Sequence, residues 1–194
     1  MSIRVIAGTA KGRRLKLVPG DSTRPIMDRV KESLFNIIGR TILDSSFLDV
    51  FAGTGSVGIE ALSRGALYAL LTDIDARAIQ TIRDNLKLTG FSDRATVRKI
   101  DAFTLFKQTP DRAYDFIYIA PPQYKNLWLT ALRSLEDNLA WLHPDGSAIV
   151  QIDPTEYAAA ELKHFALYDE RRYGSTLLLF FRPEAQHPEE ATRG

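Results

Sequence analysis

Asp49-Val50-Phe51-Ala52-Gly53-Thr54-Gly55-Ser56-Val57-Gly58 is the stretch of sequence that decides the fold. The apolar run at 47–51 predicts a buried β-strand, and a helix is expected at 56–64. Gly53, Gly55 and Gly58 give the pattern G-x-G-x-x-G at the turn between them. Glycines at such a turn let the backbone bend tightly and approach a ligand closely. The segment therefore predicts a ligand site at a strand-to-helix turn, although dinucleotide-binding enzymes share the bare pattern.

Short apolar runs alternate with amphipathic stretches along the rest of the chain. Further strands are expected at 68–72, 95–100, 115–120, 147–152, 165–168 and 176–182. Helices are expected at 25–39, 75–89, 127–142 and 154–163, with a turn at 143–146. This alternation predicts an α/β fold with a mostly parallel seven-stranded sheet that carries helices on both faces. The short link between the last two strands predicts that they pair as an antiparallel hairpin.

Length and composition fit a single domain, because 45% of the 194 residues are hydrophobic. We expect this domain at 1–183, with an N-terminal β-hairpin plus helix at 1–40, an α/β core at 41–183 and a disordered polar tail at 184–194. No apolar run reaches the roughly 20 residues that cross a bilayer, and the first residues lack the apolar segment of a signal peptide. The chain has no cysteine, which excludes disulfides and thiolate ligands. We expect a cytoplasmic monomer without a metal site.

The small net charge of +1 hides an uneven distribution of charge along the chain. Residues 1–40 carry nine Lys or Arg against three Asp or Glu, whereas the remaining residues carry sixteen against twenty-one. A basic N-terminal segment on a slightly acidic body favours a polyanionic partner. Within the hairpin expected at 3–19, a basic strip suited to phosphates is formed by Arg4, Lys11, Arg13, Arg14 and Lys16. The alternative is a basic hairpin that is merely solvated.

Three carboxylates are expected near the glycine turn. Asp73 ends the second core strand, where an acid can bind both ribose hydroxyls of a nucleoside. Asp101 ends the third, where it could accept a hydrogen bond from an adenine amino group. Asp49 precedes the glycines, where it would repel a pyrophosphate but suit the ammonium group of a methionine. The set favours S-adenosylmethionine over NAD, although Asp101 could be a turn residue and Asp73 a helix cap, a part that Asp75 fills better.

A second motif, Ala120-Pro121-Pro122-Gln123-Tyr124, ends the fourth strand. Two prolines fix the backbone and remove two N–H donors, which leaves carbonyl acceptors, and Tyr124 can stack on a base. The segment resembles the (Asp/Asn)-Pro-Pro-Tyr motif of methyltransferases that modify exocyclic amino groups, with Ala120 in place of the acceptor residue and Gln123 inserted. The Ala120 or Pro121 carbonyl, or the Gln123 side chain, could replace that acceptor. A rigid turn with a packed tyrosine is the structural alternative.

The chain as a whole, from about residue 3 to residue 182, resembles the RsmD family of bacterial methyltransferases that modify N2 of a guanine in small-subunit ribosomal RNA. The resemblance is carried by Arg4-Val5-Ile6-Ala7-Gly8, Lys11-Gly12-Arg13-Arg14-Leu15, Thr23-Arg24-Pro25, Asp28-Arg29-Val30-Lys31-Glu32-Ser33-Leu34-Phe35-Asn36, Phe51-Ala52-Gly53-Thr54-Gly55-Ser56-Val57-Gly58-Ile59-Glu60-Ala61-Leu62 and Tyr173-Gly174. It implies a class I, Rossmann-like methyltransferase fold. It also implies that the hairpin at 3–19 contacts RNA and that Arg24 closes over the cofactor, where a solvated turn residue is the alternative.

Three sets of functional residues follow. We expect the cofactor S-adenosylmethionine to be bound by Arg24, Asp49, Phe51, Gly53, Thr54, Gly55, Asp73, Ile74, Asp101 and Ala102. We expect the catalytic segment to comprise Ala120, Pro121, Pro122, Gln123 and Tyr124. We expect nucleic acid to contact Arg4, Lys11, Arg13, Arg14, Lys16 and Arg29.

The predicted function is methylation of a guanine N2 amino group in small-subunit ribosomal RNA, with the RNA or a subunit assembly intermediate as partner. A base inside a duplex would have to be extruded, whereas a loop is easier to reach. One alternative is a DNA adenine-N6 methyltransferase, although the chain has little room for a target-recognition segment. A second is a non-catalytic RNA-binding assembly factor, which Ala120 keeps open. A small-molecule methyltransferase fits the basic N-terminus less well.

Overall fold

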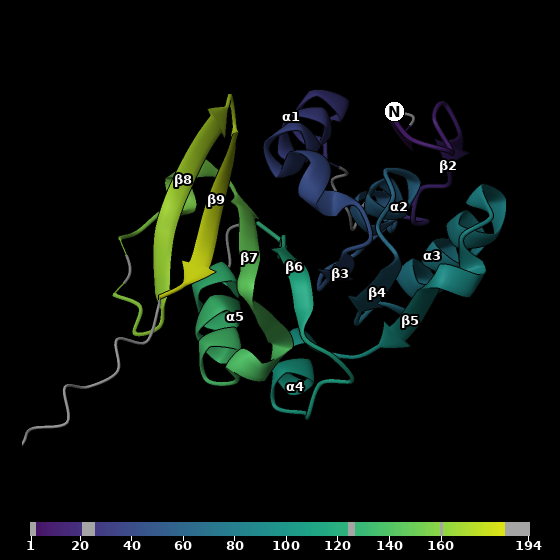
Figure 1. Cartoon of the computed structure of the whole chain (residues 1–194). Coiled ribbons are helices and arrows are strands. Elements are labelled where there is room, and N and C mark those ends of the chain that lie inside the picture. Colours follow the sequence, from purple (N-terminus) through teal and green to yellow (C-terminus); the bar gives the residue numbers. More distant parts are fainter. Residues whose placement is uncertain (1–2, 21–25, 124–126, 160, 185–194) are drawn as a thin grey trace, which may run out of the picture.

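The computed structural model describes residues 3–20, 26–123, 127–159 and 161–184. Its main feature is a seven-stranded sheet with helices on both faces (Figure 1). The strands are β3 (Ser46–Asp49), β4 (Tyr68–Asp73), β5 (Ala95–Lys99), β6 (Tyr114–Ile119), β7 (Leu142–Ile152), β8 (Phe165–Tyr173) and β9 (Thr176–Pro183). The α-helices are α1 (Asp28–Ile38), α2 (Ser56–Ser63), α3 (Ala76–Thr89), α4 (Ala102–Phe106) and α5 (Leu127–Glu136). Short 3-10 turns are η1 (Gly39–Ile42), η2 (Ser92–Arg94), η3 (Leu139–Trp141) and η4 (Pro154–Glu156).

The strand order is β5-β4-β3-β6-β7-β9-β8. The five neighbouring strands β5, β4, β3, β6 and β7 pair in parallel, and β9 pairs antiparallel with both β7 and β8. The predicted fold class is therefore confirmed, including the final antiparallel hairpin. From β3 the chain builds outward through β4 and β5, and it then returns to build β6 and β7 on the other side. Open α/β sheets bind ligands at such a switch point, beyond the carboxyl ends of the strands.

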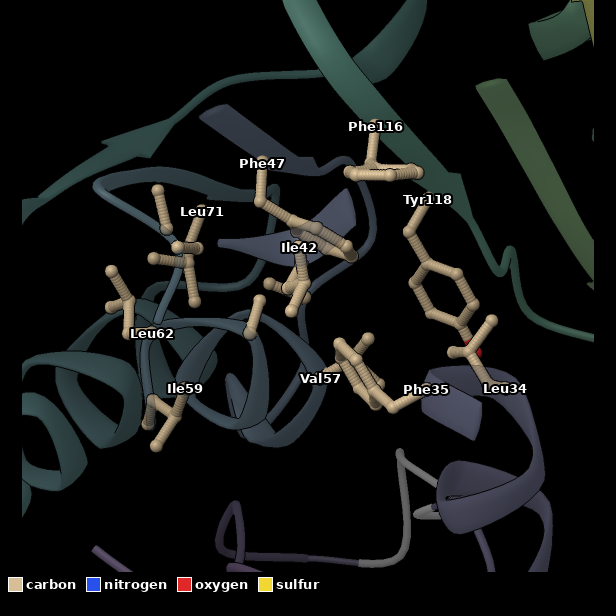
Figure 2. Close-up of a cluster of buried hydrophobic side chains, with 14 of the residues drawn as sticks. Leu34, Phe35, Ile42, Phe47, Val57, Ile59, Leu62, Leu71, Phe116 and Tyr118 are labelled. Atoms are coloured by element: carbon tan, nitrogen blue, oxygen red, sulfur yellow. The ribbon is translucent and has the colours of Figure 1, made fainter. Parts of the chain in front are cut away.

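Each face of the sheet has its own core because successive strand residues point to opposite sides. Phe47 faces α1, where its ring lies 6.2 Å from that of Phe35, and Phe116 extends the same cluster (Figure 2). On the other face, α4 and α5 bury Phe106 and Trp128. Figure 1 shows α1, α2 and α3 on one side and α4 and α5 on the other. The sheet is thus held rigidly from both sides.

The N-terminal hairpin is short and is fastened to the core by a buried carboxylate. Its strands are only β1 (Ile3–Arg4) and β2 (Arg14–Leu15), paired antiparallel. Glu60 of α2 is fully buried and accepts hydrogen bonds from the backbone N–H groups of Ile6 and Ala7 at 2.8 and 3.0 Å. Buried Lys31 lies 3.5 Å from Glu60 and donates to the Arg4 carbonyl at 2.7 Å. These bonds fix the hairpin against α1 and α2.

Several predicted elements near the carboxyl half of the chain differ from the structure. The helix expected at 154–163 is wrong, because only η4 forms and most described residues after it are exposed. A short helix without a buried apolar face gains too little to persist. The helix expected at 127–142 ends at Glu136, and α4 was not expected. The turn expected at 143–146 lies within β7, where the pairing with β6 shifts register and the ladder bulges around Pro144.

Candidate active site

A cavity of about 580 Å³ opens at the switch point of the sheet. It lies beyond the carboxyl ends of β3, β4 and β6 and beside the first turn of α4. Twelve of the predicted site residues line it: Asp49, Phe51, Gly53, Thr54, Asp73, Ile74, Asp101, Ala102, Ala120, Pro121, Pro122 and Gln123. The structure thus brings the glycine turn, the three carboxylates and the Pro-Pro turn to one place.

Three residues of the predicted cofactor and catalytic sets are not among those that line the cavity. Arg24 and Tyr124 lie outside the described residues. Gly55 lies behind the loop: a side chain there would meet Leu71 and Ile82 at 3.2–3.3 Å. Its φ of 77° makes it the left-handed residue at which α2 begins. Gly55 therefore shapes the turn and does not face the cavity.

The third glycine of the pattern is needed for packing. A Cβ atom on Gly58 would lie 2.8 Å from Leu71 Cδ2, so a side chain there would displace Leu71 from between α2 and β4. The close approach also brings the Gly58 N–H within 3.1 Å of Asp49 Oδ2, at the end of β3. The glycine pattern thus decides how the first carboxylate of the cavity is held.

Asp49 is the most unusual ionisable group of the cavity. Its side chain is 1% exposed, and Oδ1 is buried with no hydrogen-bond partner in the described part of the chain. Burial raises the pKa of this carboxyl to about 7; the Gly58 N–H opposes the rise, and nearby Asp73 adds to it. A buried acceptor without a donor is costly, so the site is suited to a ligand that brings a cationic donor. A methionine ammonium group is such a donor.

Asp73 organises the loop and also faces the cavity. Its Oδ2 accepts from the Gly53 N–H at 2.9 Å, and its Oδ1 accepts from the Asp75 N–H at 2.9 Å. Asp75 caps α3 by accepting from the Arg77 N–H, so Asp73 is not the helix cap. A carboxylate has about four acceptor positions, and these two bonds leave acceptor capacity for ribose hydroxyls.

Asp101 is a helix cap that also lines the cavity. It caps α4, since Oδ1 accepts from the Thr104 N–H at 2.9 Å, and it lines the cavity. Ile74, which is 67% exposed, and Phe103 also line the cavity. Apolar side chains around an acceptor are suited to a flat heterocycle with an amino group. Sequence reasoning missed Phe103 because it missed α4, whose first turn carries that ring.

Two further residues, Tyr118 and Gln151, were missed. Both line the cavity, and the Tyr118 hydroxyl donates to Gln151 Oε1 at 2.6 Å. The Tyr118 ring points from β6 toward Leu34 of α1 (Figure 2). Burial raises the pKa of Tyr118 well above its ordinary value, with a smaller effect of Asp49, so the hydroxyl remains a donor. No sequence motif marks this pair, because only the register of β6 and β7 brings it together.

The predicted nucleic-acid contacts fall into two groups. Arg4 and Lys16 form exposed ion pairs with Asp28 at 3.0 Å and Asp84 at 2.7 Å, so their charges are partly neutralised. The other four predicted contacts are exposed and have no ion pair within the described ranges: Lys11, Arg13, Arg14 and Arg29. Of the six predicted contacts, these four have charges that are available to phosphates.

The sheet order, the glycine turn and the carboxylates at the strand ends define a class I, Rossmann-like methyltransferase. The chain belongs to the family described as "Conserved hypothetical protein 95", whose model matches residues 3–182. This confirms the RsmD-like family that the sequence resembles. S-adenosylmethionine is the cofactor of this class, and the cavity fits it: Asp49 offers an unpaired buried acceptor to an ammonium group, and Asp73 and Asp101 offer acceptors to a nucleoside.

Named relatives extend over nearly the whole chain. It is 38% identical to "Putative rRNA methyltransferase YlbH" of Bacillus subtilis, over 93% of this chain and 98% of that protein. It is 32% identical to "Ribosomal RNA small subunit methyltransferase D" of Escherichia coli, over 97% of this chain and 94% of the relative. A solved structure of a putative methyltransferase from Escherichia coli superposes with a TM-score of 0.85 at 32% identity, covering 96% of this chain and all of that one.

Proposed function

We propose that this protein methylates the N2 amino group of a guanine in small-subunit ribosomal RNA, with S-adenosylmethionine as methyl donor. The observation that carries the proposal is the single cavity that joins the Asp49 pocket to the Ala120–Gln123 turn. Relatives named as ribosomal RNA methyltransferases, one of them specifically for the small subunit, support the substrate class. The guanine N2 target rests on the resemblance of the Pro-Pro turn to motifs that handle exocyclic amines.

Within this proposal, the carboxylates hold the cofactor. Asp49 accepts from the ammonium group through Oδ1, Asp73 accepts from the ribose hydroxyls, and Asp101 accepts from the adenine amino group. Ile74 and Phe103 enclose the ring and exclude water from it. When bound, S-adenosylmethionine supplies a methyl group activated by the sulfonium charge. The protein's own contribution is to fix the two reactants in one geometry and to stabilise the charge that develops on the amine.

The Pro-Pro turn positions the target base. Pro121 is buried, whereas Ala120 and Gln123 are partly exposed in the cavity wall. Neither proline donates a hydrogen bond, so the carbonyls of this segment serve as acceptors for an amino group. Tyr124 would stack on the base, and Arg24 would close over the cofactor; both roles are proposals from the sequence.

The exposed basic groups of the hairpin and α1 carry the RNA contact in this proposal. Lys11, Arg13, Arg14 and Arg29 neutralise phosphates, which supplies affinity without base selectivity. A small-subunit assembly intermediate is the proposed physiological form of the substrate, and a monomer the proposed form of the protein.

One observation favours a second function, that of an RNA-binding assembly factor without turnover. Ala120 has no side-chain acceptor where the motif that it resembles has an acid or an amide. Under that reading the cavity would bind cofactor and the hairpin would bind RNA, but no methyl group would be transferred.

Mapping of methylated guanines tests the proposal. Small-subunit RNA from cells with and without the gene is compared, and the purified protein is incubated with methyl-labelled cofactor and either naked RNA or unmethylated particles. We expect one guanine N2 to gain label, and the variant Asp49→Asn to give little. Label on adenine N6 or on DNA would reject the guanine target. Binding of both ligands with no label on any nucleic acid would establish the assembly-factor function instead.

A further inference from the structure

Strand β7 lies next to Ala120 and carries the side-chain amide of Gln151. Ala120 is the position at which the related motif has an acceptor side chain. Ile119 of β6 pairs with Val150 of β7, so Ala120 and Gln151 are the next residues along these two parallel strands. Neighbouring strands lie roughly 4.8 Å apart, and residues at matching positions point to the same face. Both residues line the cavity. The side-chain amide of Gln151 therefore lies next to the space that the side chain of an Asn or Asp at position 120 would fill.

The Gln151 amide is held in a defined orientation. The Tyr118 hydroxyl donates to Gln151 Oε1 at 2.6 Å, and Tyr118 itself is only 2% exposed. Tyr118 is fixed because it lies on β6 opposite Asp49 and Ile149 and packs toward Leu34 of α1 (Figure 2). A carbonyl oxygen has two lone pairs, so Oε1 can accept a second hydrogen bond from the cavity side.

We propose that Gln151 accepts a hydrogen bond from the target amino group and so replaces the side chain that is absent at Ala120. Tyr118 is then a positioning residue, because it acts by orienting the Gln151 amide. This inference rests on the proposed function, since it assigns a residue to that reaction.

The chemistry explains why a neutral amide is suited to this task. An exocyclic amine is conjugated with its ring and becomes nucleophilic only as its nitrogen loses that conjugation. Its N–H groups become stronger donors as charge develops, so an acceptor fixed beforehand lowers the barrier more than it stabilises the bound substrate. Gln151 Oε1 can accept only from a group that donates hydrogen bonds, which an amino group does and an unprotonated ring nitrogen does not.

Gln123 is the competing residue, because it lies in the same cavity wall and has the same amide. The two differ in support: Gln151 stands on a paired strand with its oxygen bound by Tyr118, whereas Gln123 lies on the turn after Pro122. Catalytic groups are more precisely placed by strands than by loops. The matched substitutions Gln151→Met and Gln123→Met remove the same amide at each place with little change in side-chain length.

The experiment measures the single-turnover rate on unmethylated small-subunit particles, the dissociation constant for S-adenosylmethionine and the melting temperature of each variant. We expect Gln151→Met to lower the rate about 10- to 100-fold, with cofactor affinity within about twofold. We expect Tyr118→Phe to lower the rate less than Gln151→Met does, and Gln123→Met also to lower it less than Gln151→Met, because the turn residue is not the acceptor in this proposal. The double variant Ala120→Asn with Gln151→Met should regain most of the rate, because the acceptor returns on β6. A purely structural role of Gln151 would not be rescued in this way.

The outcomes separate the two levels of the argument. An unchanged rate in Gln151→Met, or a loss that Ala120→Asn does not restore, overturns the inference and leaves the proposed function intact if wild type labels guanine. A large loss in Gln123→Met with none in Gln151→Met assigns the acceptor to the turn. No labelling of any RNA by the wild type rejects the proposed function and the inference together.

Discussion

The Gly58 N–H donates to Asp49 Oδ2 at 3.1 Å, and this contact leaves Asp49 Oδ1 as a buried oxygen without a partner in the described part of the chain. Gly58, nine residues further along the chain, thereby affects the ionisation of the Asp49 carboxyl. The N–H stabilises the ionised form, but burial outweighs it and raises the pKa of Asp49 to about 7. The carboxyl is therefore close to half ionised at neutral pH when no cation is bound.

Replacing Asp49 with Asn should stabilise the protein at high pH in the absence of cofactor. A carboxyl whose pKa rises on folding contributes stability that is present below its unfolded pKa and is lost as pH rises through its folded pKa. For Asp49 this window runs from about 4 to about 7, and a shift of that size corresponds to at most about 4 kcal/mol. Urea unfolding at pH 5 and pH 8 checks it. Wild type should lose more stability between the two pH values than Asp49→Asn; equal losses would contradict the buried acid.

Affinity for S-adenosylmethionine should rise with pH around 7, because the ammonium group pairs with the ionised form of Asp49. Below that pH the protonated carboxyl must first lose its proton, so affinity should fall by up to tenfold per pH unit. Titration calorimetry between pH 5.5 and pH 8.5 measures it. Asp49→Asn should bind about 10- to 100-fold more weakly at pH 8, since a charged hydrogen bond is worth about 1.5–3 kcal/mol. The ammonium contact would be refuted if Asp49→Asn bound S-adenosylmethionine as tightly as the wild type at pH 8 and if its affinity did not depend on pH.

Charge reversal of Arg13 and Arg14 to Glu should weaken RNA binding and flatten its dependence on salt. Both side chains are exposed on the hairpin, and each phosphate contact releases counterions. Cofactor affinity should stay the same, because the hairpin does not line the cavity. Lys107→Glu with Arg133→Glu is the matched control, with the same change of charge on exposed residues after α4 and on α5. Equal effects of the two pairs in filter binding would show a mere effect of net charge.

Gly8→Ala should destabilise the protein strongly, and Gly12→Ala only mildly. Both glycines have positive φ, 81° and 83°, which costs an alanine about 1–2 kcal/mol. At Gly8 the added Cβ would also lie 1.8 Å from the Ser63 carbonyl oxygen, whereas at Gly12 it meets nothing within 4 Å. We expect a loss of more than about 3 kcal/mol for Gly8→Ala in urea unfolding. Similar losses at both positions would mean that the hairpin does not pack on α2 as closely as described.

Local patterns in the sequence are sufficient for much of the fold. The run at 47–51 and the glycines after it predict a strand, a tight turn and a helix, and the structure has β3 and α2 there. Asp75 and Gly90 mark the ends of α3 as cap residues, as their types suggest. The helix expected at 154–163 does not form beyond η4, because most described residues after η4 are exposed and a short helix there gains little from burial.

The sequence by itself determined the seven strands of the main sheet, the glycine turn and the positions of Asp49, Asp73 and Asp101 after strands, because each follows from neighbours a few residues apart. Only the tertiary structure decided the rest: that the Asp49 carboxyl is buried, that Glu60 fastens the hairpin, and that Gln151 lies beside Ala120 with its amide bound by Tyr118. Burial and cross-strand pairing depend on segments far apart in the chain, and their register is set by packing of the whole sheet.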